Sequence, residues 1–189
     1  MRSSKLNLFL TALFSLFLYQ SFSQTQQYTA PKMPVDNETN LITYSEVVDV
    51  PGTTKSELYK RTEAWFMSTY KNPSEVIRER DSVNLKIVGK PRFRITNEPN
   101  EKGVKTDAGL VQYTITVACR DNKCKYTISE INWKQASYFP IEKWVEQKDR
   151  FKQNNYYLVQ TDSVLKKDVG ASLEKALKTA PKKSNKDQW

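Results

Sequence analysis

The sequence predicts an α+β fold, in which an antiparallel β-sheet carries helices on one face as a two-layer sandwich. Residues 110–134 alternate apolar and polar side chains on both sides of a short turn, which is typical of a hairpin with one buried face. Residues 54–71 and 162–180 instead repeat their apolar side chains with helical spacing. Because a helix with one apolar stripe has to bury it, we expect these helices to cover the apolar face of the sheet.

The first 23 residues have the parts of a secretory signal peptide. Arg2 and Lys5 make a basic start, residues 6–19 are mainly apolar, and Ser21 and Ser23 place small side chains at the two positions read before the expected cleavage point. The apolar stretch is shorter than the roughly 20 residues that a membrane-spanning helix needs, which favours a cleaved signal over an anchor. We therefore expect an exported protein, periplasmic or secreted, with no membrane span after cleavage.

The composition excludes several kinds of catalytic site. The chain of 189 residues contains no histidine, which removes His-based triads, His general bases and most zinc sites. No phosphate-binding loop or nucleophile elbow is present, so we expect neither a cofactor nor a metal. The net charge of +9 is spread along the chain, and export separates the protein from most nucleic acid, so nucleic acid is not an expected partner.

Residues 24–34 predict an extended polar lead-in, and residues 35–180 predict a single domain. The first strand is expected at residues 41–50, ended by Pro51-Gly52. Its apolar side chains fall on one face, which only Glu46 interrupts: Ile42, Tyr44, Val48 and Val50.

A helix is predicted to follow Thr54, which is a suitable N-cap and forms a capping box with Glu57. The helix is expected to end at Asn72-Pro73, because proline cannot continue it. One stripe holds its large side chains: Leu58, Thr62, Trp65, Phe66 and Tyr70.

Residues 83–95 predict a strand that is interrupted near Gly89-Lys90-Pro91, where proline indicates a sheet edge or a bulge. A long polar loop and the hairpin follow. Residues 135–160 predict a loop-rich segment with a short helix around Trp144. A closing helix is expected to start at Asp162 or Ser163, with one apolar stripe: Leu165, Val169, Leu173, Ala176 and Leu177. Residues 181–189 predict a basic, disordered tail.

The two cysteines lie on either side of the hairpin turn. A two-residue turn at Asp121-Asn122 places Cys119 opposite Cys124 in a non-hydrogen-bonded pair, where Cα atoms approach to about 4.5 Å. That separation permits a disulfide, and export permits oxidation. The alternative is a pair of buried, unreactive thiols. A redox or metal role is less favoured, because the pair lacks the C-x-x-C spacing and further ligands.

Two groups of residues could form a binding surface. Arg120, Lys123 and Lys125 are expected on the polar face of the hairpin, where the alternative is an ordinary solvated face. Trp133 and Trp144 belong to a late aromatic cluster, where the alternative is packing against the sheet.

Glu130 falls among the apolar positions of its strand, so a buried carboxyl group with a raised pKa is a further possibility. Its strand ends nearby, so the alternative is that the side chain simply reaches solvent. No second carboxylate is placed beside it by the sequence.

Three stretches resemble a bacterial family, domain of unknown function 4468, which is described as having a TBP-like fold. They read MPVDNETNLITYSEVVDVPGTTKSELYKRTEAWF, KIVGKPRF and VQYTITVACRDNKCKYTISEI. The resemblance covers residues 33 to approximately 131 and implies a sheet with helices on one side in proteins exported by Gram-negative bacteria. It supplies no catalytic residue, and fold alone does not transfer function.

The TBP-like core is accordingly expected at residues 35–134, with a C-terminal loop and helix at residues 135–180. We expect a non-catalytic envelope or secreted module that binds a protein or a glycan. The alternative is a hydrolase that uses two carboxylates on cell-wall or polysaccharide substrate.

Overall fold

The computed structural model describes residues 28–134, 137–146 and 153–180. The expected signal peptide at residues 1–23 and the expected tail at residues 181–189 lie outside this part of the chain. Within it, no helix has both the length and the apolar character to cross a membrane.

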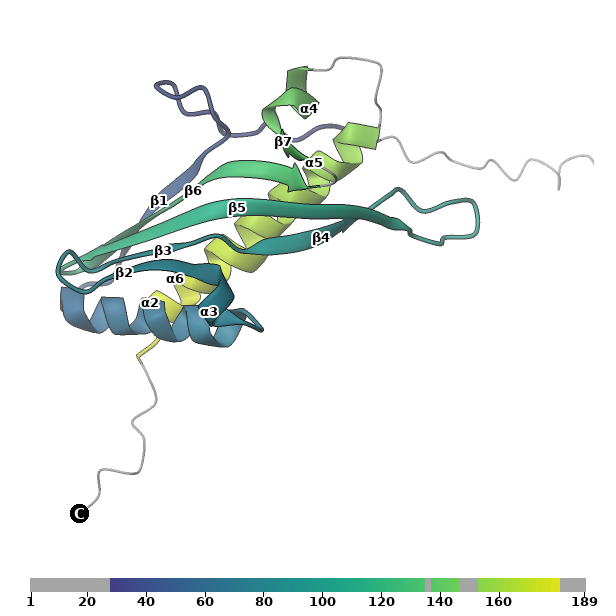
Figure 1. The fold of residues 1–189 in the computed structure, drawn as a ribbon. Coiled ribbons are helices and arrows are strands. Elements are labelled where there is room, and N and C mark those ends of the chain that lie inside the picture. The colour runs from purple at the N-terminus through teal and green to yellow at the C-terminus, as the bar shows by residue number, and fades with distance from the viewer. Residues whose placement is uncertain (1–27, 135–136, 147–152, 181–189) are drawn as a thin grey trace, which may run out of the picture.

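The protein is an α+β structure, as predicted, with one antiparallel sheet of seven strands and helices packed against it (Figure 1). The strands are β1 (Tyr44–Asp49), β2 (Ile77–Asp81), β3 (Lys86–Gly89), β4 (Arg92–Thr96), β5 (Asp107–Arg120), β6 (Lys123–Lys134) and β7 (Tyr138–Pro140). The helices are α2 (Lys55–Thr69), α3 (Pro73–Val76), α4 (Glu142–Glu146), α5 (Gln153–Ser163), the π-helix η1 (Val164–Gly170) and α6 (Ala171–Lys178).

The strand order is β1-β6-β5-β3-β2, so the long hairpin β5–β6 forms the centre of the sheet. After β3 ends, β4 continues along the same edge of β5, and β7 also pairs with β6. The sheet is therefore five strands wide, because β3 and β4 occupy one position beside β5 as two halves of an interrupted strand.

One face of the sheet packs against α2, α5 and α6 and forms the core. Buried side chains alternate along β5 and β6, and they meet the buried side chains of the helices. The hydroxyl group of Thr62 in α2 lies 3.5 Å from the sulfur of Cys119, which places that helix directly on the hairpin. We call the other side the open face, because no helix of the described residues covers it (Figure 1).

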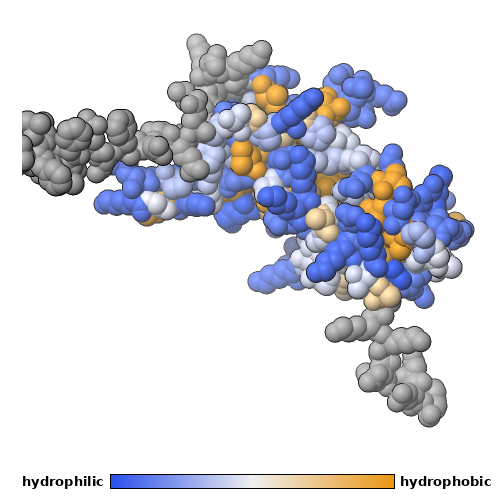
Figure 2. All heavy atoms as spheres, turned by 180° about the vertical axis from the view of Figure 1, so that it is seen from behind, coloured by the Kyte–Doolittle hydropathy of each residue, from blue (hydrophilic) through white to orange (hydrophobic). Residues whose placement is uncertain are grey.

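The surface offers no broad apolar area in the view of Figure 2. Hydrophilic residues cover most of this side, and hydrophobic residues lie between them in small patches. The exposed large apolar residues among those described are scattered along the chain: Val35, Val47, Met67, Val83, Val104, Tyr138 and Val145. Single exposed apolar residues of this kind are normal for a protein surface.

The first strand and the first helix lie where the sequence predicts them. The four apolar positions of the first strand are buried. Glu46 lies at the rim of that buried face, where its carboxylate accepts a hydrogen bond of 2.8 Å from the Tyr126 hydroxyl. Thr54 caps α2 by accepting from the Glu57 N–H at 3.3 Å, but the Glu57 carboxylate bonds to Arg61, so the second half of the capping box is not formed.

The hairpin has the predicted register, with Cys119 opposite Cys124 across a turn at Asp121-Asn122. Asn122 takes the left-handed backbone that such a turn requires, with φ of 67°. The turn also contacts the start of α2, because the Asp121 carboxylate accepts from the Lys55 N–H at 2.8 Å. This contact ties the tip of the hairpin to the first turn of the helix.

Four elements differ from the prediction or were not foreseen. Residues 73–76 form α3, the charged segment before residue 83 forms β2, residues 138–140 form β7, and α5 begins at Gln153 rather than at a cap near Asp162. Ser163 and Ala171 both have helical dihedral angles, so α5, η1 and α6 follow one another without a break. Asp162 is not a cap, because its carboxylate accepts from the Tyr44 hydroxyl at 2.8 Å.

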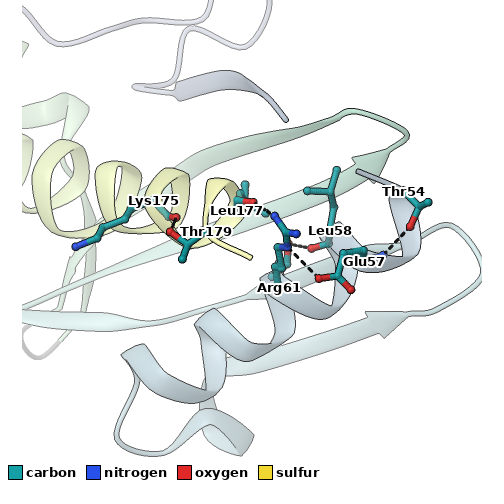
Figure 3. A network of polar contacts seen from close by, with 8 residues as sticks. Thr54, Glu57, Leu58, Arg61, Lys175, Leu177 and Thr179 are labelled. Atoms are coloured by element: carbon teal, nitrogen blue, oxygen red, sulfur yellow. Dashed lines mark hydrogen bonds and ion pairs between the residues drawn. The ribbon is translucent and has the colours of Figure 1, made fainter. Parts of the chain in front are cut away.

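The helical run of residues 153–178 is fixed at both ends. Near its start, the Gln160 side chain accepts from the Thr96 N–H at 3.1 Å and donates to the Thr96 carbonyl at 2.9 Å. Near its end, the Arg61 guanidinium donates to the carbonyl oxygen of Leu177 at 2.7 Å (Figure 3). In the middle, Gly170 passes so close to Tyr126 that an added Cβ would lie 2.8 Å from the phenol oxygen.

Candidate binding site on the open face

Three irregularities interrupt the sheet at one level. The register of β2 shifts at Arg78, β3 and β4 are separated by Lys90-Pro91, and the pairing of β5 with β6 shifts between Gln112 and Thr114. They adjoin one another, because Ile77 pairs with Gly89 and the Tyr113 N–H donates to the Pro91 carbonyl at 3.1 Å. We call this row the bulge line. Bulges change the direction of side chains and are frequent beside functional sites.

Glu130 is the extra residue of β6 at the bulge line. Its φ of 51° lies in the left-handed region, which is uncommon for a residue other than glycine. The bulge turns its side chain to the open face, where it is 54% exposed, and returns Ile131 to the core. The possibility of a buried carboxyl group with a raised pKa is therefore wrong, and the side chain reaches solvent, which was its alternative.

The carboxylate of Glu130 is held by two donors. The Thr114 hydroxyl donates to Oε2 at 2.7 Å, and the Lys90 ammonium donates to the same oxygen at 3.1 Å. These hydrogen bonds, that of Thr114 first, lower the pKa of Glu130. The group is therefore an ionised carboxylate at neutral pH, with its Oε1 atom free of any hydrogen bond to a described residue.

The bulge line is hollowed in two adjoining places. The central hollow, of about 440 Å³, lies on the open face around Arg78, Lys90, Gln112, Thr114, Glu130 and Tyr138. The edge notch, of about 390 Å³, lies between β4 and the segment that joins α2 to β2, and it includes Lys71 and Arg92. Arg78, Lys90 and Gln112 line both hollows, so the two form one continuous depression.

Several polar groups of this depression are oriented by hydrogen bonds. The Tyr138 hydroxyl donates to Gln112 Oε1 at 3.1 Å, which directs the Gln112 Nε2 donors elsewhere. The Asn132 side chain donates to the Glu130 carbonyl at 2.7 Å and so supports the bulge. Within the described chain, the guanidinium groups of Arg78 and Arg92 form neither an ion pair nor a hydrogen bond. The depression therefore presents donors that have no partner among the described residues beside the unbonded Oε1 acceptor of Glu130.

The three basic residues that the sequence offers as a binding surface lie elsewhere on the open face. Arg120, Lys123 and Lys125 surround a smaller hollow of about 280 Å³ near the tip of the hairpin, together with Val47 and Ala118. The bulge line lies farther along β6 than Lys123 and Lys125. These cations therefore extend the positive charge of the open face toward the hairpin tip.

Trp133 and Trp144 do not lie on the open face. Trp144 is 3% exposed, and its ring centroid lies 5.5 Å from those of both Trp133 and Tyr157. The Trp133 indole donates to the carbonyl oxygen of Ala108 at 2.7 Å. The cluster fixes α4 and α5 to the end of the sheet, which is the packing role that was the alternative for these aromatic residues.

The two cysteines lie in the core of the protein. Cys119 and Cys124 are free and buried, and their sulfur atoms are 2.6 Å apart on the face covered by α2. The hydrogen bond to Cys119, followed by burial, raises the pKa of Cys124, so its thiol is not activated at neutral pH.

The depression contains two carboxylates, one in each hollow. Among the described residues, no group of three or more metal-ligating acidic, cysteine or histidine side chains is assembled. Glu130 is the carboxylate of the central hollow, and Glu75 is that of the edge notch.

Part of this site is marked in the sequence. The apolar alternation that Glu130 breaks and the Lys90-Pro91 interruption both mark the bulge line. Arg78 could not be placed there, because β2 was not foreseen.

The fold has known relatives. Residues 44–134 match the family described as domain of unknown function (DUF4468) with TBP-like fold. A DUF4468 family protein from Bacteroides ovatus has a similar structure, with a TM-score of 0.61 and 16% identity over 78% of this chain and 93% of its own.

A TBP-like protein from Parabacteroides distasonis is also similar, with a TM-score of 0.52 and 15% identity over 74% of this chain and 97% of its own. No curated protein matches the chain. At such identities the likeness to the two solved structures speaks for the fold. The family match and the shared architecture confirm the resemblance seen in the sequence, and residues 44–134 are a domain of the bacterial DUF4468 family with its TBP-like fold.

Proposed function

We propose that this chain is a non-catalytic binding module of the cell envelope or the secreted fraction, which receives a protein or glycan partner on its open face. The observation that carries the proposal is a sheet face that no helix of the described residues covers, with a polar depression and two guanidinium groups that have no partner in that part of the chain. Polar groups that are oriented but have no partner of their own are what a binding surface offers to a ligand.

The hydrolase alternative has less support. A general acid needs a carboxyl group with a raised pKa, whereas the pKa of Glu130 is lowered by its bonds to Thr114 and Lys90. A pair of carboxylates on either side of a substrate would also be needed. The two carboxylates of the depression lie in different hollows, Glu130 in the central hollow and Glu75 in the edge notch.

The proposal can be tested by affinity capture with the tagged protein lacking residues 1–23. Envelope extract and purified cell-wall polymer are offered separately, at low and at moderate salt. An open-face variant, Lys123→Gln with Lys125→Gln, is compared with a helix-side variant, Lys60→Gln with Lys175→Gln. All four lysines are exposed, so both variants remove the same charge.

We expect a stoichiometric ligand that survives moderate salt, is weakened by the open-face variant and is unaffected by the helix-side variant. Equal weakening by both variants would mean that net charge alone governs capture. That result, or no ligand from either source, would contradict the proposed function.

A further inference from the structure

We propose that the central hollow and the edge notch together bind an acidic saccharide, with ring hydroxyl groups at Glu130 and Gln112 and the anionic substituent toward Arg78 and Arg92. This inference rests on the proposed function and names the ligand class of the same open face. It is carried by the mixture of unused acceptors and donors in one depression.

The centre of the depression is suited to hydroxyl groups. A hydroxyl group both donates and accepts, so it can donate to the free Oε1 of Glu130 while accepting from Nε2 of Gln112. Oε2 of Glu130 is already occupied by Thr114 and Lys90, which fixes the carboxylate in place. A site that holds its polar groups in advance loses less entropy on binding.

The edge of the depression is suited to one anionic group. Glu130 already pairs with Lys90, whereas Arg78 and Arg92 have no partner among the described residues and Lys71 lies beside them in the notch. A guanidinium group binds carboxylate, sulfate or phosphate oxygens in a bidentate manner. The notch also contains Glu75, but its cations outnumber this one carboxylate, so positive charge is in excess on the notch side: Lys71, Arg78, Lys90 and Arg92.

The central hollow also has an aromatic wall. Tyr138 is 57% exposed, and its hydroxyl group is fixed by Gln112. The ring presents apolar surface beside polar groups, which matches the two-sided character of a sugar ring. By contrast, the fixed carboxylate at the centre disfavours a densely charged polyanion such as nucleic acid or a run of acidic residues.

The backbone conformation of Glu130 also favours a functional site in this depression. Glu130 keeps a left-handed φ of 51°, a conformation that costs about 1–2 kcal/mol for a residue other than glycine. The side-chain bond from Asn132 to the Glu130 carbonyl holds the bulge in this conformation. Strained residues that persist in this way are concentrated at functional sites.

Binding can be measured by isothermal titration calorimetry with four probes on the protein lacking residues 1–23. Two are tetrasaccharides, one of galacturonic acid and one of glucuronic acid. The methyl ester of the galacturonic tetramer lacks its charges, and hexaglutamate carries charge without sugar hydroxyls. We expect at least one uronic tetramer to bind, and the ester and the peptide to bind about tenfold more weakly or not at all.

The decisive variant is Glu130→Gln, which keeps the shape of the side chain and removes its negative charge. If Glu130 accepts hydrogen bonds from hydroxyl groups, this variant should weaken binding of the uronic tetramer about tenfold, although it makes the site more positive. A purely electrostatic surface would bind every anion more tightly after the change. Arg78→Gln should weaken binding of the acidic tetramer about tenfold, and Lys60→Gln, which removes an exposed cation on the helix side, is the control.

Three results would overturn the inference. They are the absence of binding by both uronic tetramers, equal binding of hexaglutamate, and tighter binding by Glu130→Gln. None of them touches the proposed function, because capture of an envelope protein that depends on Lys123 and Lys125 would still establish the open face as a binding surface. Failure of both experiments would remove both proposals.

Discussion

Glu130 and Ile131 illustrate how a single bulge residue divides side chains between the two faces of the sheet. Without the extra residue, strict alternation would place the carboxylate in the core and Ile131 on the open face. The left-handed backbone of Glu130 costs about 1–2 kcal/mol, whereas burial of an unpaired carboxylate costs far more. The bulge is therefore the less costly solution, and it also supplies the depression with its central acceptor.

At Gly170, two effects of an added methyl group oppose each other. Alanine is a better helix former than glycine by about 1 kcal/mol, but a Cβ would lie 2.8 Å from the Tyr126 phenol oxygen. We expect Gly170→Ala to lower the free energy of unfolding by about 1–2 kcal/mol, because overpacking exceeds the propensity gain. Urea unfolding measures the change.

The matched background for this test is Tyr126→Phe, which removes the phenol oxygen. In that background Gly170→Ala should be less destabilising, although the Leu165 carbonyl oxygen still lies 3.3 Å from the added Cβ, and the double-mutant cycle gives the coupling between positions 126 and 170. Identical effects of Gly170→Ala in both backgrounds would show that the close approach to Tyr126 does not limit this position.

The paired cysteines give a second prediction for single residues. We expect protein recovered from an oxidising compartment to contain a Cys119–Cys124 disulfide, because the two residues are opposite each other in the hairpin and their sulfur atoms face one another. Thiol titration of the denatured, unreduced protein should then find no free thiol. Reduction should lower stability by no more than about 2 kcal/mol, because the closed loop is short. Two free thiols in protein from that compartment would contradict this prediction.

At the scale of elements, the sequence predicted what strong local patterns determine. The alternation in residues 110–134 yielded the hairpin and its register, and Thr54 with its apolar stripe yielded α2. Strand β2 was not predicted, because four of its five residues are charged and only Ile77 is buried, so its sequence shows no apolar alternation. Helix α5 was not predicted, because its sequence shows no clear apolar stripe. The helix also continues into η1, so no N-cap is needed at Asp162.

Arg61 joins two elements that are distant in the sequence, as Figure 3 shows. Its guanidinium donates to Glu57 Oε1 at 3.0 Å and to the Leu177 carbonyl at 2.7 Å, and its side chain is only 11% exposed. Arg61→Met keeps most of the aliphatic stem and removes both bonds. We expect it to lower the free energy of unfolding by about 1–3 kcal/mol, because hydrogen bonds to a charged group are lost.

Lys178→Met is the control for this prediction, since Lys178 forms an exposed ion pair with Glu174 within α6, the helix that also contains Leu177. Exposed pairs of this kind contribute about 0–1 kcal/mol. Chemical unfolding of both variants makes the comparison. If Arg61→Met were as stable as Lys178→Met, the contact between α2 and α6 would not depend on the guanidinium.

At the scale of the whole molecule, the candidate site joins residues that are far apart in the chain. Arg78, Lys90, Gln112 and Glu130 come from four different parts of the sheet and meet only at the bulge line. Local patterns marked two of them, at Lys90-Pro91 and at Glu130. Their convergence could not be read from the sequence, because it depends on the order in which the strands pair.

Buried tyrosines predict how the stability of the whole protein depends on pH. Burial raises the pKa of Tyr70 to about 12, and burial also raises that of its partner Tyr113, whose oxygen lies 3.1 Å away. In the unfolded chain tyrosine loses its proton near pH 10. Between pH 10 and pH 12 the unfolded state therefore binds fewer protons, and the free energy of unfolding falls as the pH rises.

For Tyr70 alone the loss should be about 1 kcal/mol per pH unit in this range. Urea unfolding from pH 8 to about pH 11 measures the slope, and Tyr70→Phe should make it shallower. Replacement of the exposed Tyr138 by Phe controls for the loss of a surface phenol. An unchanged slope in Tyr70→Phe would contradict a role for this buried phenol.

The helical run from Gln153 to Lys178 also determines when folding can be completed. All seven strands precede it in the chain, yet it covers the apolar face of the central hairpin. In a chain that emerges from its N-terminal end, the side chains that this run covers therefore remain in water until the run has appeared. Until then, the emerging chain offers an apolar surface to chaperones or to another copy of itself, and a chain cut short within the run would keep that hazard permanently.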